Sequence, residues 1–124
     1  MDAKTGASIF QLPTGTPVFS SLAIARGILY YGNFSGKLTA LDLTTQKPIW
    51  VFESEASKEN APAITNADGS CNFEKIFSSP NPFYDDMVVA VGKLLSTGSF
   101  LSSPVVVENV LYIGSTDGNL YTLM

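Results

Sequence analysis

An internal repeat constrains this chain more than any other feature of its sequence. Residues 102–124 are a second copy of residues 20–42, and the two stretches align without a gap at residue numbers that differ by 82. The identical pairs are Ser20 and Ser102, Ser21 and Ser103, Leu29 and Leu111, Tyr30 and Tyr112, Gly32 and Gly114, Gly36 and Gly118, Leu38 and Leu120, and Leu41 and Leu123. A second alignment, at a difference of 40, matches Asp2, Thr5, Ile9 and Phe10 with Asp42, Thr45, Ile49 and Trp50. Self-similarity at such a period is typical of repeat proteins, so we predict an array of units of about 40 residues.

Each unit is predicted to contain four short antiparallel strands. Residues 102–124 hold three apolar runs that are rich in β-branched and aromatic residues. Gly36 and Gly118 each lie between two such runs, where a tight turn needs a residue that tolerates positive φ. After Asp2 and Asp42, the Asp and Thr side chains are expected to bond amides of a turn that precedes the fourth strand. The predicted fold class is therefore all-β.

The repeats predict a single array domain over the whole chain. Residues 2–12 are predicted to be the last strand of a unit, 18–52 a complete unit, 54–74 an inserted polar loop, 75–99 a shortened unit and 100–124 the final unit. One helical turn is expected around Glu55 to Asn60, inside the inserted loop. The run MVVAV at residues 87–91 is predicted to be the second strand of the shortened, degenerate middle unit.

Composition excludes several classes of function. The net charge is −4 and the seven basic residues are spread along the chain, so no phosphate-binding stripe for nucleic acid is expected. There is no histidine, which excludes Ser-His and Cys-His nucleophilic pairs and the common zinc sites. No apolar stretch approaches the roughly 20 residues of a membrane span. The sequence also lacks an apolar signal core, so the protein is either cytosolic or targeted by a segment outside this chain.

Two acidic motifs are weighed as candidate sites and rejected. Asp85 and Asp86 are adjacent, and adjacent residues of a strand point to opposite faces, so a solvated turn is expected there. The stretch Asn66 to Gly69 resembles part of a calcium loop, but the first and last ligand positions would be Ile64 and Lys75. We therefore predict a turn at residues 66–69, and no catalytic residue, metal site or cofactor.

The repeat pattern resembles a known family. The matching residues are Ala40, Asp42, Thr45 and Trp50, followed in the last unit by Ser102, Ser103, Pro104, Tyr112, Asp117, Gly118, Leu120 and Tyr121. This pattern is similar to the pyrroloquinoline-quinone-like repeat of β-propellers. The family includes quinoprotein dehydrogenases, the propeller lipoprotein of the bacterial outer-membrane barrel-assembly machinery, and propellers found with serine/threonine kinases.

The resemblance implies a partial β-propeller of about three four-stranded blades, with the middle one degenerate. It also implies structural blade-docking roles for Asp2, Thr5, Phe10, Asp42, Thr45 and Trp50, with Trp50 buried against the neighbouring blade. Propellers close with roughly 4–8 blades, and an open array exposes apolar faces and strand edges. We therefore expect either a fragment of a longer protein, which we favour, or a subunit that closes by oligomerising. In both cases the isolated chain is expected to self-associate, with residues 8–12 completing the final blade of a neighbour.

Two functions from different classes follow from the resemblance. The first is a non-catalytic scaffold that binds a protein or a ligand, in the periplasm or cell envelope if the parent protein carries a signal. The alternative is a fragment of a quinone-dependent dehydrogenase. The family's pair of adjacent cysteines is absent, because Cys71 is the single cysteine, and no carboxylate and Asn cluster for calcium is evident. We therefore favour the scaffold.

Overall fold

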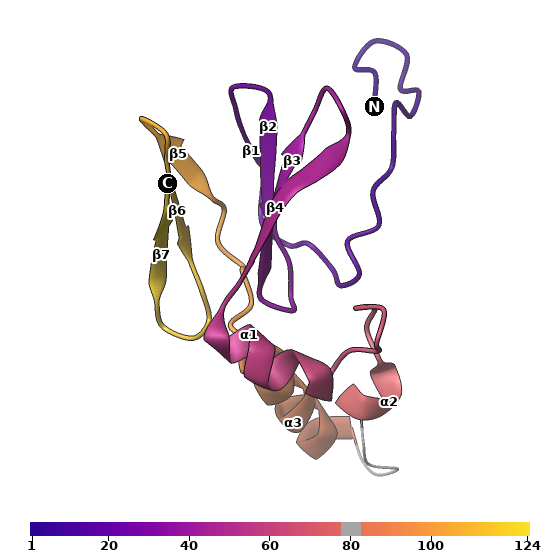
Figure 1. Cartoon of the computed structure of the whole chain (residues 1–124). Coiled ribbons are helices and arrows are strands. Elements are labelled where there is room, and N and C mark those ends of the chain that lie inside the picture. Colours follow the sequence, from indigo (N-terminus) through magenta and orange to yellow (C-terminus); the bar gives the residue numbers. More distant parts are fainter. Residues whose placement is uncertain (78–82) are drawn as a thin grey trace.

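The chain folds into two antiparallel sheets with a helical segment between them in sequence (Figure 1). The structure is a computed structural model that describes residues 1–77 and 83–124. The first sheet consists of β1 (Ala23–Ala25), β2 (Ile28–Gly32), β3 (Lys37–Asp42) and β4 (Lys47–Glu53), in that order. The second sheet consists of β5 (Val105–Val107), β6 (Val110–Gly114) and β7 (Leu120–Leu123).

The sequence repeat is reproduced in the strand register. Tyr30 lies opposite Ala23, and its counterpart Tyr112 lies opposite Val105. In the same way, β2 pairs with β3 through Leu29 and Leu41, and β6 pairs with β7 at the equivalent positions. The prediction of antiparallel strands in residues 18–52 and 100–124 is therefore confirmed.

The turns between strands are also repeated. The two-residue loop between β1 and β2 has positive φ at both Arg26 and Gly27, which is the type I′ geometry that suits a tight hairpin. Glu108 and Asn109 have positive φ at the equivalent loop of the second sheet. The glycines that were predicted to occupy turns, Gly36 and Gly118, have φ values of 78° and 86°.

The two sheets pack face to face around a common apolar core. Leu38, Phe100, Leu111 and Ile113 are buried together, and Tyr30, Phe52, Val106, Tyr121 and Leu123 pack around them. Gly32 allows this approach, because a Cβ atom at residue 32 would overlap the Phe100 side chain. The inner strands β1 and β5 lie beside each other, and the Ser21 amide donates to the Ser103 hydroxyl at 3.1 Å.

The described residues between β4 and β5 include several helices, which lie at one end of the sheets (Figure 1). The elements are α1 (Glu55–Asn60), the 3₁₀-helix η1 (Ala61–Ala63), α2 (Phe73–Ile76) and α3 (Phe83–Leu95). The helical turn predicted at Glu55 to Asn60 is confirmed as α1, which the Ser54 side chain caps. A small second core of Ile64, Ile76 and Ala90 holds the helical segment together.

The prediction of a shortened blade at residues 75–99 is wrong. Residues 87–91, predicted to be a strand, lie in α3, and the two sheets pack directly on each other, with none of the described residues forming a blade between them. The chain therefore contains two sheets among its described residues, rather than about three blades, and only one of them has four strands. Ser78 to Pro80, predicted to begin that blade, lie outside the described residues.

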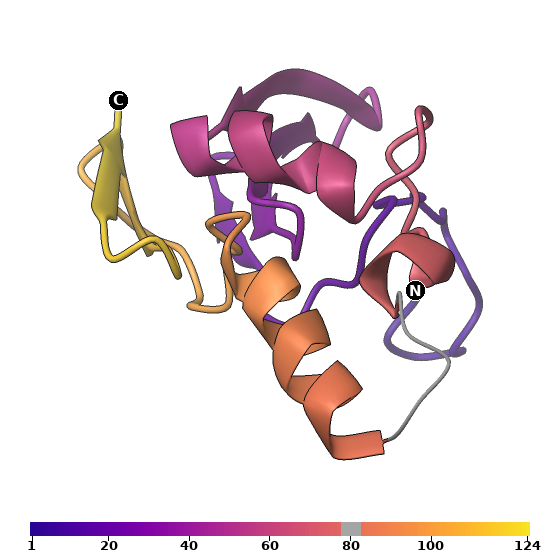
Figure 2. The ribbon, with the colours of Figure 1, turned by 90° about the horizontal axis from the view of Figure 1, so that it is seen from below.

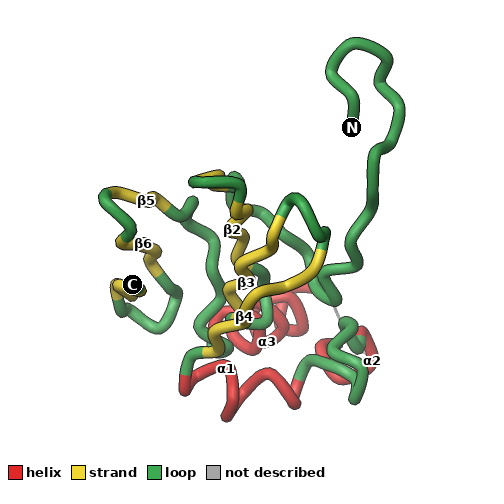
Figure 3. The backbone as a smooth tube through the Cα atoms, turned by 45° about the horizontal axis from the view of Figure 1, so that its top comes forward, coloured by secondary structure: helices red, strands yellow, loops and turns green. Residues whose placement is uncertain are grey.

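The amino-terminal segment lies on the side of the first sheet that faces away from the second sheet (Figures 1 and 2). Residues 2–6 form a turn, and residues 7–12 belong to no sheet, so the strand predicted there is not formed in the single chain. Figure 3 shows the first residues extending away from the body of the molecule. Residues 14–17 return to the body, where the Phe34 amide donates to the Pro17 carbonyl.

Candidate functional site

Most of the buried polar side chains among the described residues gather at one place, the turn between β2 and β3. The Asn33 carboxamide oxygen accepts from the Ser35 hydroxyl at 3.0 Å and from the Lys37 amide at 3.1 Å. The Ser35 amide donates to the Thr16 hydroxyl at 3.2 Å. These bonds fix the turn and the segment that precedes the first sheet.

The same turn anchors the helical segment. The Ser57 hydroxyl lies 2.5 Å from the Ser35 carbonyl oxygen and 2.9 Å from Glu53 Oε1. The Thr97 and Ser99 hydroxyls lie 2.7 and 2.6 Å from the Phe34 carbonyl oxygen. Every buried side-chain polar atom in the described part of the chain has a partner, so this serine and threonine cluster is a structural anchor.

The predicted Asp turns form at both places where the repeat puts them. Asp42 Oδ1 accepts from the amides of Thr44 and Thr45, and Asp2 Oδ1 accepts from those of Lys4 and Thr5. The amides of Thr5 and Lys4 hold the pKa of the Asp2 carboxyl below its ordinary value. At the last turn position, Gln46 has a φ of 57° where Gly6 has 71°.

The six predicted blade-docking residues fall into two separate groups. Asp42, Thr45 and Trp50 belong to the β3–β4 hairpin, whereas Asp2, Thr5 and Phe10 belong to the amino-terminal segment. Trp50 is 37% exposed and its ring packs on Tyr30, with 6.1 Å between centroids. Trp50 is therefore not buried within one chain as predicted, and its docking role stays a prediction.

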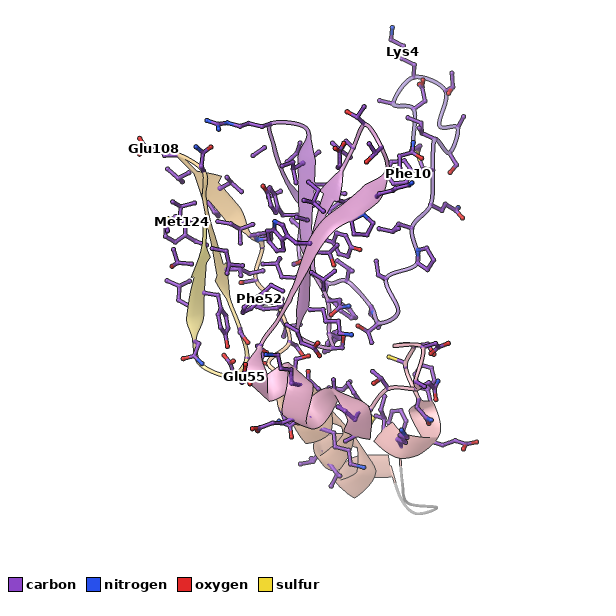
Figure 4. The ribbon with its side chains drawn as sticks, in the orientation of Figure 1. Lys4, Phe10, Phe52, Glu55, Glu108 and Met124 are labelled. Carbon is purple, nitrogen blue, oxygen red and sulfur yellow. The ribbon has the colours of Figure 1, made fainter. Side chains whose placement is uncertain are left out.

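A cleft opens between the outer strands of the two sheets. Trp50, Val51 and Phe52 of β4 line one wall, Leu123 and Met124 line the other, and the cleft has a volume of about 260 Å³. Phe52 points from β4 toward the second sheet, where its ring centroid lies 5.1 Å from that of Tyr121 (Figure 4). Sequence reasoning did not find this cleft, because its walls come from residues about 70 positions apart.

Asp117 and Tyr121 form a pair in the β6–β7 hairpin, and the Tyr121 ring packs on Phe52, which lines the cleft. The Tyr121 hydroxyl donates to Asp117 Oδ2 at 2.6 Å. Partial burial alone would raise the pKa of Asp117, but the hydrogen bonds from Tyr121, Asn119 and Ser115 lower it overall. The pKa of the Tyr121 hydroxyl is raised by its bond to Asp117 and by burial. This hydrogen bond joins the turn between β6 and β7 to strand β7.

Each sheet has a second face that the other sheet does not cover. On the second sheet this open face carries Val105, Val107, Tyr112 and Leu120, and all four side chains are exposed. On the first sheet the second face carries exposed Ile24 and Val51, but Tyr31, Thr39 and Leu41 on the same face are buried, so this face is largely covered. We use the term "open face of the second sheet" for the four exposed residues of that sheet.

The outer strands also present free edges. β4 and β7 each pair with one neighbour among the described residues, so backbone groups along the other edge of each strand have no sheet partner there. The second sheet has no counterpart of β4, which makes β7 its outer strand. Apolar open faces and free strand edges are the features of a surface that receives another polypeptide.

The acidic motifs carry no site in the described residues. Asn66 to Gly69 form the predicted turn, in which the Gly69 amide donates to the Asn66 carbonyl. Asp85 and Asp86 lie in α3 rather than in a turn before a strand, and their side chains lie outside the described part. Among the described residues, no group of three or more acidic or cysteine side chains could hold a metal ion. Burial raises the pKa of the Cys71 thiol.

No protein-family model matches the sequence, and no curated protein matches it. None of the helices in the described ranges is both long and apolar enough to cross a lipid bilayer.

Proposed function

We propose that this chain is a non-catalytic binding scaffold made of two blades of the pyrroloquinoline-quinone-like propeller type. The observation that carries the proposal is the repetition of register and turns between the two sheets, combined with the open apolar face of the second sheet and a free edge on β7. A sheet with these features gains stability when another polypeptide covers it. The partner class is a protein, and the location is the periplasm or cell envelope if the parent protein carries a signal.

The free edge of β7 is the place where a strand would be added. In the first sheet the equivalent edge is filled by β4, which follows the Asp42 turn. Residues 7–13 follow the Asp2 turn with the same spacing, and they have no sheet partner in the single chain. We therefore propose that this segment of one molecule completes the second sheet of another, in the manner of β-strand addition.

A peptide that spans residues 2–13 tests the strand addition on the full chain. A fluorescent form of this peptide is expected to bind saturably, with a rise in fluorescence anisotropy, and to compete with self-association. The control peptide carries Ile9→Pro and Phe10→Pro, because adjacent strand residues point their amides to opposite sides and one of the two must face β7. Equal binding of the two peptides, or no binding of either, would contradict strand addition.

The dehydrogenase alternative has its own test. If the chain were part of a quinone enzyme, addition of pyrroloquinoline quinone and Ca²⁺ would give a stoichiometric complex with a bound chromophore. The scaffold proposal predicts that the quinone passes through gel filtration separately from the protein. Stoichiometric uptake would replace the scaffold with the alternative.

A further inference from the structure

The cleft between β4 and β7 continues toward α1 and changes its chemistry there. This second part is a cavity of about 610 Å³ that shares Val51 and Phe52 with the apolar part described above. Figure 4 shows Glu55 at this end, beside the turn between β6 and β7. The two parts therefore form one groove with an apolar half and a charged half. The residues that line the charged half are Val51, Phe52, Glu53, Glu55, Lys58 and Tyr121.

Acidic groups outnumber basic groups in the charged half. Glu53 and Glu55 line it with one basic residue, Lys58, which forms an ion pair with Glu55 at 2.6 Å. A third carboxylate, that of Asp117, accepts from the Tyr121 hydroxyl at 2.6 Å. Neither Glu53 nor Asp117 has an ion-pair partner in the described part of the chain. We call Glu53, Glu55 and Asp117 the acidic end of the groove.

Aromatic rings lie next to these carboxylates. The centroids of the Phe52 and Tyr121 rings are 5.1 Å apart, and both side chains are only partly buried. The aliphatic stem of an arginine or lysine side chain packs on such rings, and its cationic head is attracted both to aromatic faces and to carboxylates. The acidic end therefore fits a basic side chain of a bound polypeptide whose apolar residues occupy the other half of the groove.

The strand register determines where that basic side chain would lie. In the first sheet, Val51 of β4 lies opposite Thr39 of β3. The repeat relates Thr39 to Tyr121, so the residue equivalent to Val51 on a strand added to β7 would lie opposite Tyr121. In the chain's own segment 7–13, that residue is Gln11, which carries no charge. The segment matches the edge of β7 but leaves the acidic end without a cation.

We infer that the groove binds an extended segment of a partner protein in which apolar residues precede an arginine or lysine. The apolar residues lie in the half of the groove beside Leu123, and the basic side chain lies at the acidic end beside Tyr121. This inference rests on the proposed function, because the segment enters as a strand along β7, and it names the chemistry of the partner. The net charge of −4 also attracts a basic partner at longer range.

Four forms of peptide 2–13 test the inference by fluorescence anisotropy with the full chain: the unaltered peptide, Gln11→Arg, Gln11→Glu and Ser8→Arg. The Ser8→Arg peptide is the matched control, because it has the same net charge as Gln11→Arg but places the arginine toward the apolar half. The Gln11→Arg peptide is expected to bind about three- to tenfold more tightly than this control at low salt, and the Gln11→Glu peptide should bind most weakly. The advantage should shrink at about 1 M salt, because the charges lie near the surface.

Charge reversal in the full chain assigns the effect to the groove. Glu55→Lys should remove the preference for the Gln11→Arg peptide and favour the Gln11→Glu peptide instead. Glu74→Lys is the matched control, because Glu74 is also an exposed glutamate in the first turn of a short helix but does not line the groove. This variant should keep the preference for arginine. Circular dichroism verifies that both variants fold.

Equal binding of the Gln11→Arg and Ser8→Arg peptides would overturn the inference. Tightest binding of the unaltered peptide would also overturn it, and would assign the groove to the chain's own segment. A preference for arginine that survives Glu55→Lys would do the same, because the acidic end would then not be its cause. In all three cases the peptides still bind, so strand addition stands and only the basic partner is lost. Absence of binding by every peptide would instead contradict strand addition itself, and the inference with it.

Discussion

The two sheets of this molecule have the same register and the same turns, but different environments. Leu38 and Leu120 occupy equivalent strand positions, yet one is fully buried and the other is 70% exposed. Gly32 and Gly114 are likewise equivalent, and only Gly32 lies under a buried aromatic ring. The repeat sequence thus determines the local structure of a unit. The contribution of each side chain to the stability of the fold depends instead on what packs against the sheet.

The largest expected difference between the two sheets concerns the leucines. Leu38→Ala should lower the free energy of unfolding by about 2–5 kcal/mol, because it leaves a cavity in the core shared with Phe100. Leu120→Ala should change it by at most about 0.5 kcal/mol when the chain is monomeric, because that side chain is exposed. Chemical denaturation at a concentration where the chain is monomeric measures both. Equal losses would mean that the exposed leucine is covered in the isolated chain.

The glycines give the next largest contrast. Gly32→Ala should cost about 1–3 kcal/mol, because the new methyl group overlaps the Phe100 side chain at the interface of the sheets. At Gly114 the methyl group would lie 3.3 Å from the Ser102 hydroxyl, which bonds the Gly114 amide and carbonyl but lies at the surface, so Gly114→Ala should cost clearly less than Gly32→Ala. Melting temperatures of the two variants check this pair. A strong loss at residue 114 would contradict the contrast.

A smaller effect is expected at the hairpin that only the first sheet completes. Gln46 has a φ of 57°, a region that costs a residue with a Cβ atom about 1–2 kcal/mol, and the equivalent turn has Gly6. Gln46→Gly should therefore stabilise the chain by about 1 kcal/mol or less, since glycine also gains freedom in the unfolded state. Thr45→Gly, one residue earlier and without positive φ, is the control and should destabilise. Thermal unfolding distinguishes the two.

The smallest effect concerns the pair of Asp117 and Tyr121, which only the second sheet has. The lowered pKa of Asp117 stabilises the fold above its ordinary value of 3.8, and this contribution is lost as the pH falls through the folded-state pKa. The raised pKa of Tyr121 stabilises below its ordinary value of 10.0 and is lost as the pH rises further. Tyr121→Phe should cost about 0.5 kcal/mol near neutral pH and weaken both pH dependences. Tyr112→Phe, on the open face, is the control; identical pH profiles for the two variants would contradict the assignment.

The sequence was informative wherever a residue acts locally. The Asp42 turn, the positive φ of Gly36 and the strands of both repeats depend on neighbouring residues, so the pattern predicted them. The buried core was harder to predict from the sequence, because whether Leu38 or Leu120 is covered depends on which faces of the two sheets meet in space. The cleft between β4 and β7 could not be predicted for the same reason.

The helix at Phe83–Leu95 shows where local reasoning fails. A short run of β-branched residues such as 87–91 is compatible with either a strand or a buried helix. The deciding contacts are those of Ala90 and Leu94, four residues apart, with Ile64 and Ile76 of the preceding segment. That spacing is helical, and it was the signal in the sequence that could have identified α3.

The anchoring of the helical segment has a consequence for how the protein folds. Two repeats that are 82 positions apart must find each other before their core can form, which is a slow search for a flexible chain. Helices that are fixed to the Phe34 carbonyl by Thr97 and Ser99 bring the start of the second repeat back to the first. The segment therefore shortens the effective loop and raises the local concentration of one repeat near the other. Each doubling of loop length costs only about 0.6 kcal/mol of closure entropy. The middle of the helical segment can therefore vary in length as long as its two ends stay attached to the first sheet.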